Sequence, residues 1–297
     1  MAETYIDDIL ALKADLEERV AKGDESSILS SLISLAQALM RRGRSSEAYE
    51  YLVRAADFAF SARSLDNRER VDALSFIVDL IAEIDDEEIR ARTMNSAIEI
   101  SRRIIALAMK NFPNDRELVL GTMYQCADLL GMALCLSEAI EMTEHVIEMT
   151  AELYGQRSCL LSEVKLTQGR NYLLRGNWKR ALAELGESLD IALESDESSP
   201  SLLADIYLFI SNAHLVGGNE IAALRNIESA YDQIEEYEWD DSVRVDILLN
   251  IADVFRQLGL TGRARGALIE VIEIEEELDF GKAQIEKHRR LLLEIER

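Results

Sequence analysis

The chain contains little proline and few aromatic residues, and both shortages narrow the choice of fold. Only two prolines, Pro113 and Pro200, occur in 297 residues, so long segments carry nothing that would interrupt a helix. Seven Phe and two Trp are present, and no segment alternates apolar and polar residues as a half-buried strand would. Because Ala, Leu, Ile, Glu and Arg dominate the remainder, the composition predicts an all-α protein.

Cysteines and long apolar runs are also scarce. The three cysteines, Cys126, Cys135 and Cys159, lie in an apolar helical pattern without a C-x-x-C spacing, which predicts buried, reduced thiols in a cytoplasmic protein. No run of about 18 apolar residues is present, so we expect no membrane-spanning helix. Residues 1–8 are acidic and lack an apolar core, so we expect no signal peptide.

Basic residues are outnumbered by acidic ones. There are 32 Lys and Arg against 56 Asp and Glu, which gives a formal net charge of −24. A body this acidic repels phosphate groups, so we expect no nucleic-acid partner and no binding to an anionic membrane. The charge suits a basic partner, and it equally suits an outer face that is simply solvated, so the composition leaves both interpretations open.

No pattern typical of catalysis or metal binding is present. The three histidines, His145, His214 and His288, have no second ligand at metal-binding spacing. Two carboxylate runs, 85–88 and 275–277, fall at an expected turn and an expected helix end, and neither carries the glycine of a calcium loop. There is no nucleophile elbow, P-loop or dinucleotide-binding glycine motif. We therefore expect a protein that is not an enzyme and that has no cofactor or metal.

An internal repeat is the strongest signal in the sequence. One set of eight positions recurs with the same spacing from Leu32, from Lys165, from Tyr207 and from Leu248. A partial copy starts at Met123, where Leu134 stands in place of an expected glycine. The first copy consists of Leu32, Leu35, Ala36, Leu39, Gly43, Ala48, Leu52 and Ala55.

This spacing predicts a helical hairpin. The first four positions share one face of a helix, and the small third position lets a second helix approach closely. The glycine ends the first helix in a left-handed conformation, and the last positions continue the apolar stripe on the second helix. Each hairpin keeps one apolar flank that only a neighbouring hairpin can cover, so the pattern predicts a stacked array.

The pattern resembles the tetratricopeptide repeat family. Units are expected to begin near residues 29, 120, 162, 204 and 245, with a degenerate unit near 74. A period near 42 is similar to the long-helix variant of the family. The resemblance implies a right-handed superhelical α-solenoid of about six hairpins, forming a single domain over 1–297. Its expected parts are a capping helix within 1–25, repeats over 26–279 and a second capping helix within 280–297.

The resemblance also implies where a partner would bind, because the first helices of the family line a concave groove. Exposed apolar residues beside side-chain amides suit a peptide, because the amides would form hydrogen bonds with the peptide backbone. The alternative is a tightly wound superhelix in which these residues pack on one another. The expected partner-binding residues are Gln37, Arg41, Tyr124, Gln125, Arg170, Phe209, Asn212, Asn250, Asp253 and Arg256.

Some family members hold a terminal carboxylate with asparagines and basic residues from consecutive first helices. Asn212 and Asn250 match the two asparagine positions, and Lys287 falls near an expected lysine. Leu208 and Leu291 occupy the places of two other basic residues. Losing two charge-assisted contacts removes most of the affinity such a site would have, so this ligand is not the expected one.

The sequence thus favours a non-catalytic interaction module or scaffold that binds a protein or peptide partner. Two alternatives remain at this stage. The chain could be the sensor or regulatory domain of a signalling or transcription system, or it could be a module that self-associates as a homodimer.

Overall fold

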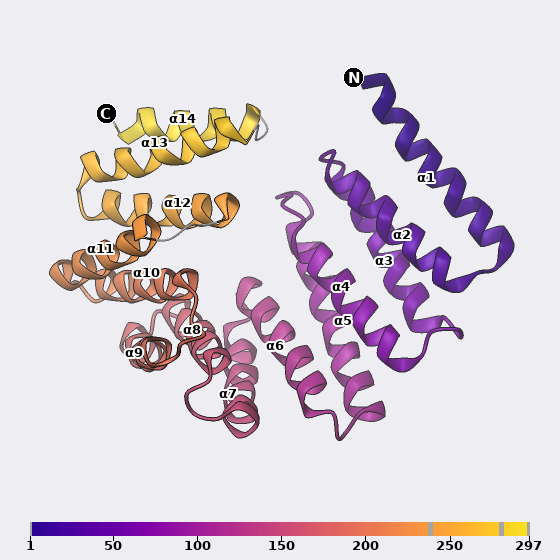
Figure 1. The fold of residues 1–297 in the computed structure, drawn as a ribbon, viewed down its shortest axis with the longest axis horizontal. Coiled ribbons are helices and arrows are strands. Elements are labelled where there is room, and N and C mark those ends of the chain that lie inside the picture. The colour runs from indigo at the N-terminus through magenta and orange to yellow at the C-terminus, as the bar shows by residue number, and fades with distance from the viewer. Residues whose placement is uncertain (1, 237–239, 279–281, 296–297) are drawn as a thin grey trace. The chain divides into compact units, whose positions relative to one another are not determined.

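The computed structural model describes residues 2–236, 240–278 and 282–295, and the side chains within them except those of 2–8, 235–236 and 282–283. These residues form fourteen α-helices and no strand (Figure 1). The first seven helices are α1 Ala2–Lys22, α2 Glu25–Met40, α3 Ser45–Ser61, α4 Asn67–Ala82, α5 Arg90–Asn111, α6 Arg116–Met132 and α7 Leu136–Tyr154. The other seven are α8 Cys159–Leu174, α9 Trp178–Glu194, α10 Pro200–Val216, α11 Glu220–Glu236, α12 Asp241–Gln257, α13 Thr261–Glu277 and α14 Lys282–Ile295.

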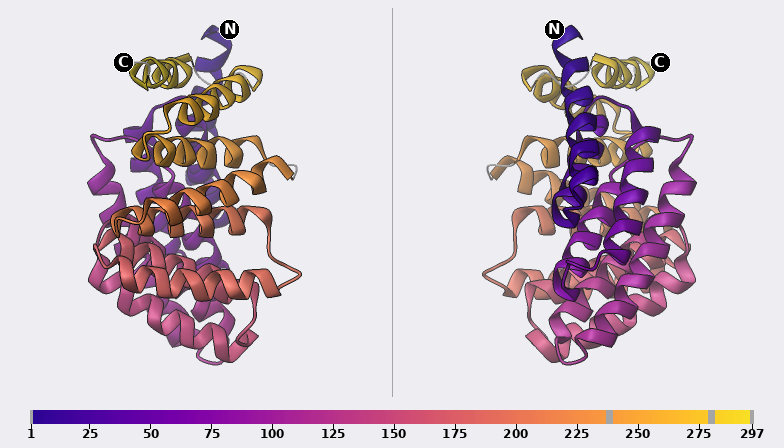
Figure 2. Two further views of the ribbon diagram at one scale, coloured as in Figure 1. Left: turned by 90° about the vertical axis from the view of Figure 1, so that its left-hand side faces the viewer. Right: turned by 90° about the vertical axis from the view of Figure 1, so that its right-hand side faces the viewer.

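The chain divides into two compact units, residues 1–142 and residues 143–297, and the division falls within α7. From α1 to α6 in the first unit and from α8 to α14 in the second, helices that follow one another in sequence also pack against one another. The side views in Figure 2 show the helices of the second unit, from salmon to yellow, as successive layers. Each unit is therefore a row of stacked helices, and the all-α solenoid predicted from the repeat is confirmed. The extent of a single domain over 1–297 stays a prediction.

The predicted hairpins correspond to the helix pairs α2–α3, α4–α5, α6–α7, α8–α9, α10–α11 and α12–α13. In five of these pairs the turn has the same geometry. One residue in the turn after the first helix has a positive φ. Its N–H donates to the carbonyl three residues earlier, and the N–H of the following residue donates to the carbonyl five residues before that residue. The five turn residues are Gly43, Leu134, Gly176, Gly218 and Gly259.

Leu134 is the one non-glycine residue with a positive φ, at 59°, among the residues that the structure describes. The hydrogen bonds that close its turn are those of the glycine turns, with Leu134 N to Gly131 O at 3.0 Å and Cys135 N to Leu130 O at 2.9 Å. The hairpin therefore imposes the left-handed conformation whether or not glycine supplies it.

Small residues occupy the helix crossings, as the repeat predicts. A Cβ atom added at Gly169 would lie 2.5 Å from Cγ of Leu185, so α8 and α9 touch at this point. Ala48, Ala223 and Ala264 are fully buried at the corresponding place on the second helices. The apolar positions of the repeat are buried around them, and they form the core of each unit.

The hairpin α8–α9 replaces part of this apolar packing by ion pairs. Lys165 is mostly buried, and its Nζ lies 2.6 Å from Oε2 of Glu187 and 3.1 Å from Oε2 of Glu184. Burial lowers the pKa of Lys165, but the hydrogen bonds to Glu187 and Glu184 outweigh it and raise the pKa above its ordinary value. Lys165 stands where two of the other complete copies of the repeat have leucine, and the structure ties α8 to α9 there through charge.

One helix flanks the repeats at each end. Ile9 and Leu16 of α1 are buried against the first hairpin, and Leu292 and Ile295 of α14 pack against the core of the last one. The apolar residues Ile6 of α1 and Ala283 of α14 lie outside the residues whose side chains are described.

The cysteines are free, but one expectation about them is wrong. Cys126 is buried and Cys159 is half-buried, whereas Cys135 is exposed. Cys135 lies in the turn between α6 and α7 rather than within a helix, and a turn residue has no neighbouring helix to cover it. No helix in the described residues combines the length and hydrophobicity needed to cross a membrane.

Candidate partner-binding cleft on the first-helix face

The ten residues expected to bind a partner all lie on first helices or on the residue that caps one. We call the surface formed by these helices the first-helix face, and we treat it separately in the two units. None of the ten side chains is buried. Arg41, Asn250, Asp253 and Arg256 are exposed, and the other six are half-buried. All ten are therefore accessible to a partner, although partner binding itself stays a prediction.

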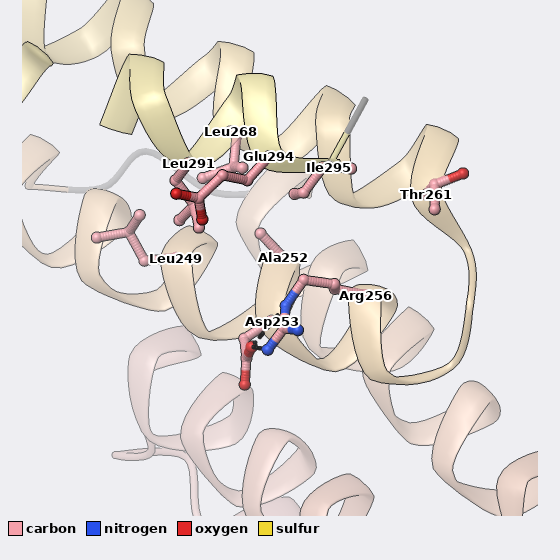
Figure 3. A pocket seen from close by; sticks show the side chains of 9 residues that line it. All are labelled: Leu249, Ala252, Asp253, Arg256, Thr261, Leu268, Leu291, Glu294 and Ile295. Carbon is pink, nitrogen blue, oxygen red and sulfur yellow. Dashed lines mark hydrogen bonds and ion pairs between the residues drawn. The ribbon is translucent and has the colours of Figure 1, made fainter. Parts of the chain in front are cut away.

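Four first-helix residues of the second unit line a cleft with α14. The cleft has a volume of about 610 Å³, and Figure 3 shows its side chains. Leu249, Ala252, Asp253 and Arg256 come from α12, and α14 supplies the opposite wall. We call this the terminal cleft. Its lining residues are Leu249, Ala252, Asp253, Arg256, Thr261, Leu268, Leu291, Glu294 and Ile295.

The charged rim of the terminal cleft is held in place by hydrogen bonds within α12. Asp253 Oδ1 accepts from Nε of Arg256 at 3.2 Å and from Nη2 of Arg256 at 2.5 Å. Asp253 Oδ2 accepts from Nε2 of Gln257 at 2.7 Å. The guanidinium of Arg256 is thereby oriented before any partner arrives, which lowers the entropy that binding would cost.

A second hollow of about 780 Å³ continues from the terminal cleft along α14. The two share Leu249, Leu291 and Glu294. The additional lining residues on α14 are Glu286, Lys287, His288 and Arg290. An extended segment lying along α12 and α14 would thus meet apolar side chains flanked by charges of both signs.

A buried hydrogen bond between a carboxylate and a histidine fixes α14 to α13 and so sets the width of the cleft. Glu275 is fully buried on α13, and its Oε2 lies 2.9 Å from Nδ1 of His288 on α14. Its other oxygen accepts from Nε2 of Gln284 at 2.7 Å. Arg289 on α14 also pairs with Glu276 on α13, with Nη2 and Oε1 2.6 Å apart. His288 therefore holds the helix in place through a carboxylate, a role that its spacing in the sequence did not suggest.

The first unit has a smaller hollow of about 540 Å³ between α4 and α6. Gln125, one of the ten expected residues, bridges its two walls. Its Nε2 donates to the carbonyl of Ser75 at 3.0 Å and to Oδ1 of Asp79 at 2.6 Å. The Gln125 amide is therefore already hydrogen-bonded to the neighbouring helix α4, so it is less available to a partner than its position suggests.

The residues considered for a carboxylate ligand do not form a polar site. Leu208 is buried, which leaves no room for a basic side chain in its place. Asn250 donates its Nδ2 to the carbonyl of Asp246 on its own helix at 2.8 Å. The described residues also contain no group of three or more His, Cys, Asp or Glu side chains that could hold a metal ion.

Reasoning from the repeat missed the α14 side of the terminal cleft. Leu291, Glu294 and Ile295 line it, but α14 lies outside the repeats, so no internal copy assigns its faces. The sequence held no separate signal for it, because the apolar positions 285, 291, 292 and 295 fall within about 120° on one face of a helix, as packing on a single neighbour requires.

The sequence matches no family model and no curated protein, but its fold matches solved structures. BtubC (BKLC) from P. vanneervenii is 17% identical, with a TM-score of 0.58 over 80% of this chain and 94% of that one. A tetratricopeptide repeat protein from Parabacteroides merdae is 15% identical, with a TM-score of 0.54 over 96% of this chain and 98% of that one. A Rap protein complexed with competence and sporulation factor is 12% identical, with a TM-score of 0.56 over 95% and 79%. At these identities the likeness concerns the fold alone, and the chain has a tetratricopeptide-like helical-repeat fold.

Proposed function

We propose that this chain is a non-catalytic interaction module that binds a peptide or protein segment on the first-helix face of its second unit. The terminal cleft is the observation that carries the proposal. It combines a volume suited to one or two side chains with apolar walls at Leu249 and Leu291 and a pre-oriented guanidinium at Arg256.

The chemistry of the cleft suits an extended segment with an apolar anchor residue. The anchor would displace water from Leu249 and Leu291, and burying about 100 Å² of apolar surface contributes roughly 2.5 kcal/mol. Arg256 would donate to backbone carbonyls or to a carboxylate of the segment, and Glu294 would accept from its amides or from a basic side chain. The neighbouring hollow along α14 would take residues on either side of the anchor.

Two further observations support this proposal. A structure with the same fold, the Rap protein, was solved in complex with competence and sporulation factor, so the fold can hold a separate molecule. The net charge of −24 would draw a basic segment toward the molecule from a distance. The free cysteines suit a reducing compartment, and we place this function in the cytoplasm.

The test is a selection of random 12-residue peptides on the immobilised full chain, followed by titration of labelled peptides by fluorescence anisotropy. Replacing Leu249 by Glu should weaken binding at least tenfold, because a charge would then occupy the apolar wall. Arg256→Ala should weaken it about threefold to tenfold. Arg225→Ala provides the matched control, since Arg225 is exposed on the second helix α11.

Binding that survives both cleft substitutions would refute the proposal. So would a selection that yields no peptide with a dissociation constant below about 100 μM. Light scattering of the free chain tests the homodimer alternative, because a dimer would have twice the chain mass of 33.5 kDa before any peptide is added.

A further inference from the structure

A third hollow in residues 143–297 shares no residue with the terminal cleft or with the hollow along α14. It lies between the second helices α11 and α13, with Phe255 of α12 in its wall, and has a volume of about 470 Å³. We call it the cation hollow. Its lining residues are Glu228, Tyr231, Asp232, Phe255, Arg263, Gly266 and Ala267.

The cation hollow already holds a positive charge from the chain itself. The guanidinium of Arg263 lies over the ring of Phe255, 5.6 Å from its centroid, and pairs with the carboxylate of Glu228. A cation placed over an aromatic face and beside a carboxylate is attracted by both. Arg263 is about half exposed, so its side chain can swing out to solvent and uncover the ring.

The hollow carries more negative charge than Arg263 uses. Asp232 is exposed at its edge and makes no ion pair with any residue that the structure describes. Tyr231 stands beside it, and the hydroxyl of Tyr231 donates to Oε2 of Glu270 at 3.3 Å. Glu270 also pairs with Arg244. The Tyr231 ring is thereby fixed from outside the hollow, while Asp232 stays available to an incoming cation.

Space for an incoming group is provided at Gly266. A Cβ atom added there would meet nothing within 4 Å, so the helix surface at this point is open. A glycine in a helix interior costs about 0.5–1 kcal/mol relative to alanine. This position therefore combines an intrinsically unfavourable residue with a direct opening into the hollow.

We propose that the cation hollow binds an arginine or lysine side chain of a protein partner, which replaces Arg263 over Phe255 and engages Asp232. The occupant is basic because every charge that the hollow offers beyond Arg263 is a carboxylate, and because the chain as a whole carries a net charge of −24. Arginine fits best, since its planar guanidinium can stack on Phe255 while it donates to Asp232 and Glu228. The site goes beyond the proposed function, because it lies on second helices and uses none of the residues of the terminal cleft.

The test uses the full chain, labelled for NMR, and two small probes that isolate the side chain. N-acetyl-arginine amide is titrated to about 50 mM at low salt, where affinities in the millimolar range are measurable. N-acetyl-citrulline amide, which has the same shape without the charge, is the comparison probe. The amide signal of Gly266 reports on the hollow, and that of Gly262 on the same helix is the reference.

We expect a saturable shift at Gly266 with the arginine probe and none with the citrulline probe. Arg263→Ala should tighten binding severalfold, because the internal competitor is gone. Asp232→Asn should weaken it about fivefold, and Gly266→Trp should abolish it by filling the opening. Asp190→Asn on α9 and Gly262→Trp are the matched controls, and each should leave the affinity within twofold of the parent chain.

The proposal is overturned if the Arg263→Ala chain shows no saturable shift, or if the citrulline probe binds equally well. It is also overturned if Gly266→Trp leaves binding intact while its helical circular dichroism matches that of the parent chain. If Gly266→Trp does not fold, the double change Glu228→Gln with Asp232→Asn takes its place, and unchanged binding in that chain has the same meaning. Leu249→Glu in the terminal cleft should not alter these titrations, so failure at one site is distinguishable from failure at the other.

Discussion

The left-handed turn at Leu134 makes a sharp prediction about stability. Leu134 has φ 59° in a turn where the other hairpins of this type carry glycine, and its side chain is 65% exposed. A side chain in this conformation brings Cβ close to the following carbonyl oxygen, which costs about 1–2 kcal/mol. Glycine avoids this cost but adds about 0.5–1 kcal/mol of conformational entropy to the unfolded chain.

The informative comparison is between Leu134→Ala and Leu134→Gly, because both remove the few contacts of the leucine side chain. If the turn imposes strain, the glycine variant should be more stable than the alanine variant by about 0.5–1 kcal/mol. Gly121 in the neighbouring helix α6 is the control, since its backbone is helical and a Cβ atom there meets nothing within 4 Å. Gly121→Ala should stabilise the protein by about 0.5–1 kcal/mol, which is the opposite preference.

Thermal and urea unfolding of these variants provide the assay. One kcal/mol corresponds to a shift in melting temperature of about 2–4 °C for a protein of 150–250 residues. If residues 1–142 and 143–297 unfold in separate steps, only the transition of the first unit should move. An alanine variant at 134 that is more stable than the glycine variant by about 0.5–1 kcal/mol, as expected at Gly121, would refute the argument, because the left-handed conformation would then carry no cost for a side chain.

Three further substitutions test the packing described above. Gly169→Ala should destabilise the protein by about 1–3 kcal/mol in urea unfolding, because its Cβ would collide with Leu185; a neutral result would mean that α8 and α9 do not touch there. Glu275→Ala should destabilise it by about 1–3 kcal/mol, since it leaves the buried His288 without its hydrogen-bond partner, whereas Ala at the exposed neighbour Glu273 should cost less than 0.5 kcal/mol. Burial raises the pKa of Asp205 to about 6, against the opposing charge of Arg170, so this group makes the folded state less stable as pH rises from about 4 to 6. Asp205→Asn should therefore stabilise the protein at pH 7 by about 1–3 kcal/mol and make no difference below pH 4, as measured by unfolding at the two pH values.

The fold was predictable because each copy of the repeat carries the same packing and turn positions of a helical hairpin. Leu35 and Leu39 on one helix, a small residue at the crossing and a glycine at the turn recur together, and each recurrence restricts the interpretation of the others. Even the degenerate hairpin α4–α5 forms where the spacing leaves room for it. The prediction that Cys135 is buried was wrong because an apolar pattern that crosses a turn looks continuous in the sequence, although the turn residue itself is exposed.

The candidate sites were less predictable, because contacts between different elements decide them. The repeat indicates which first-helix positions are accessible, and all ten expected residues are. It does not indicate that Gln125 is already hydrogen-bonded to the adjacent helix. Nor does it indicate that α14 completes a cleft with Leu249, because α14 has no copy elsewhere in the chain.

The two proposed sites differ because a helical hairpin presents two faces with different constraints. On each first helix the positions i, i+3, i+4 and i+7 must pack, which leaves the intervening positions, such as Leu249 and Asp253, free to vary with a partner. On the second helices the outer surface packs only along the edge between neighbouring hairpins. A gap in that packing, such as the one beside Gly266, opens directly toward a buried aromatic ring of the first helix. The terminal cleft therefore suits an apolar anchor side chain between two helices, whereas the cation hollow suits a single basic side chain inserted between two neighbouring hairpins.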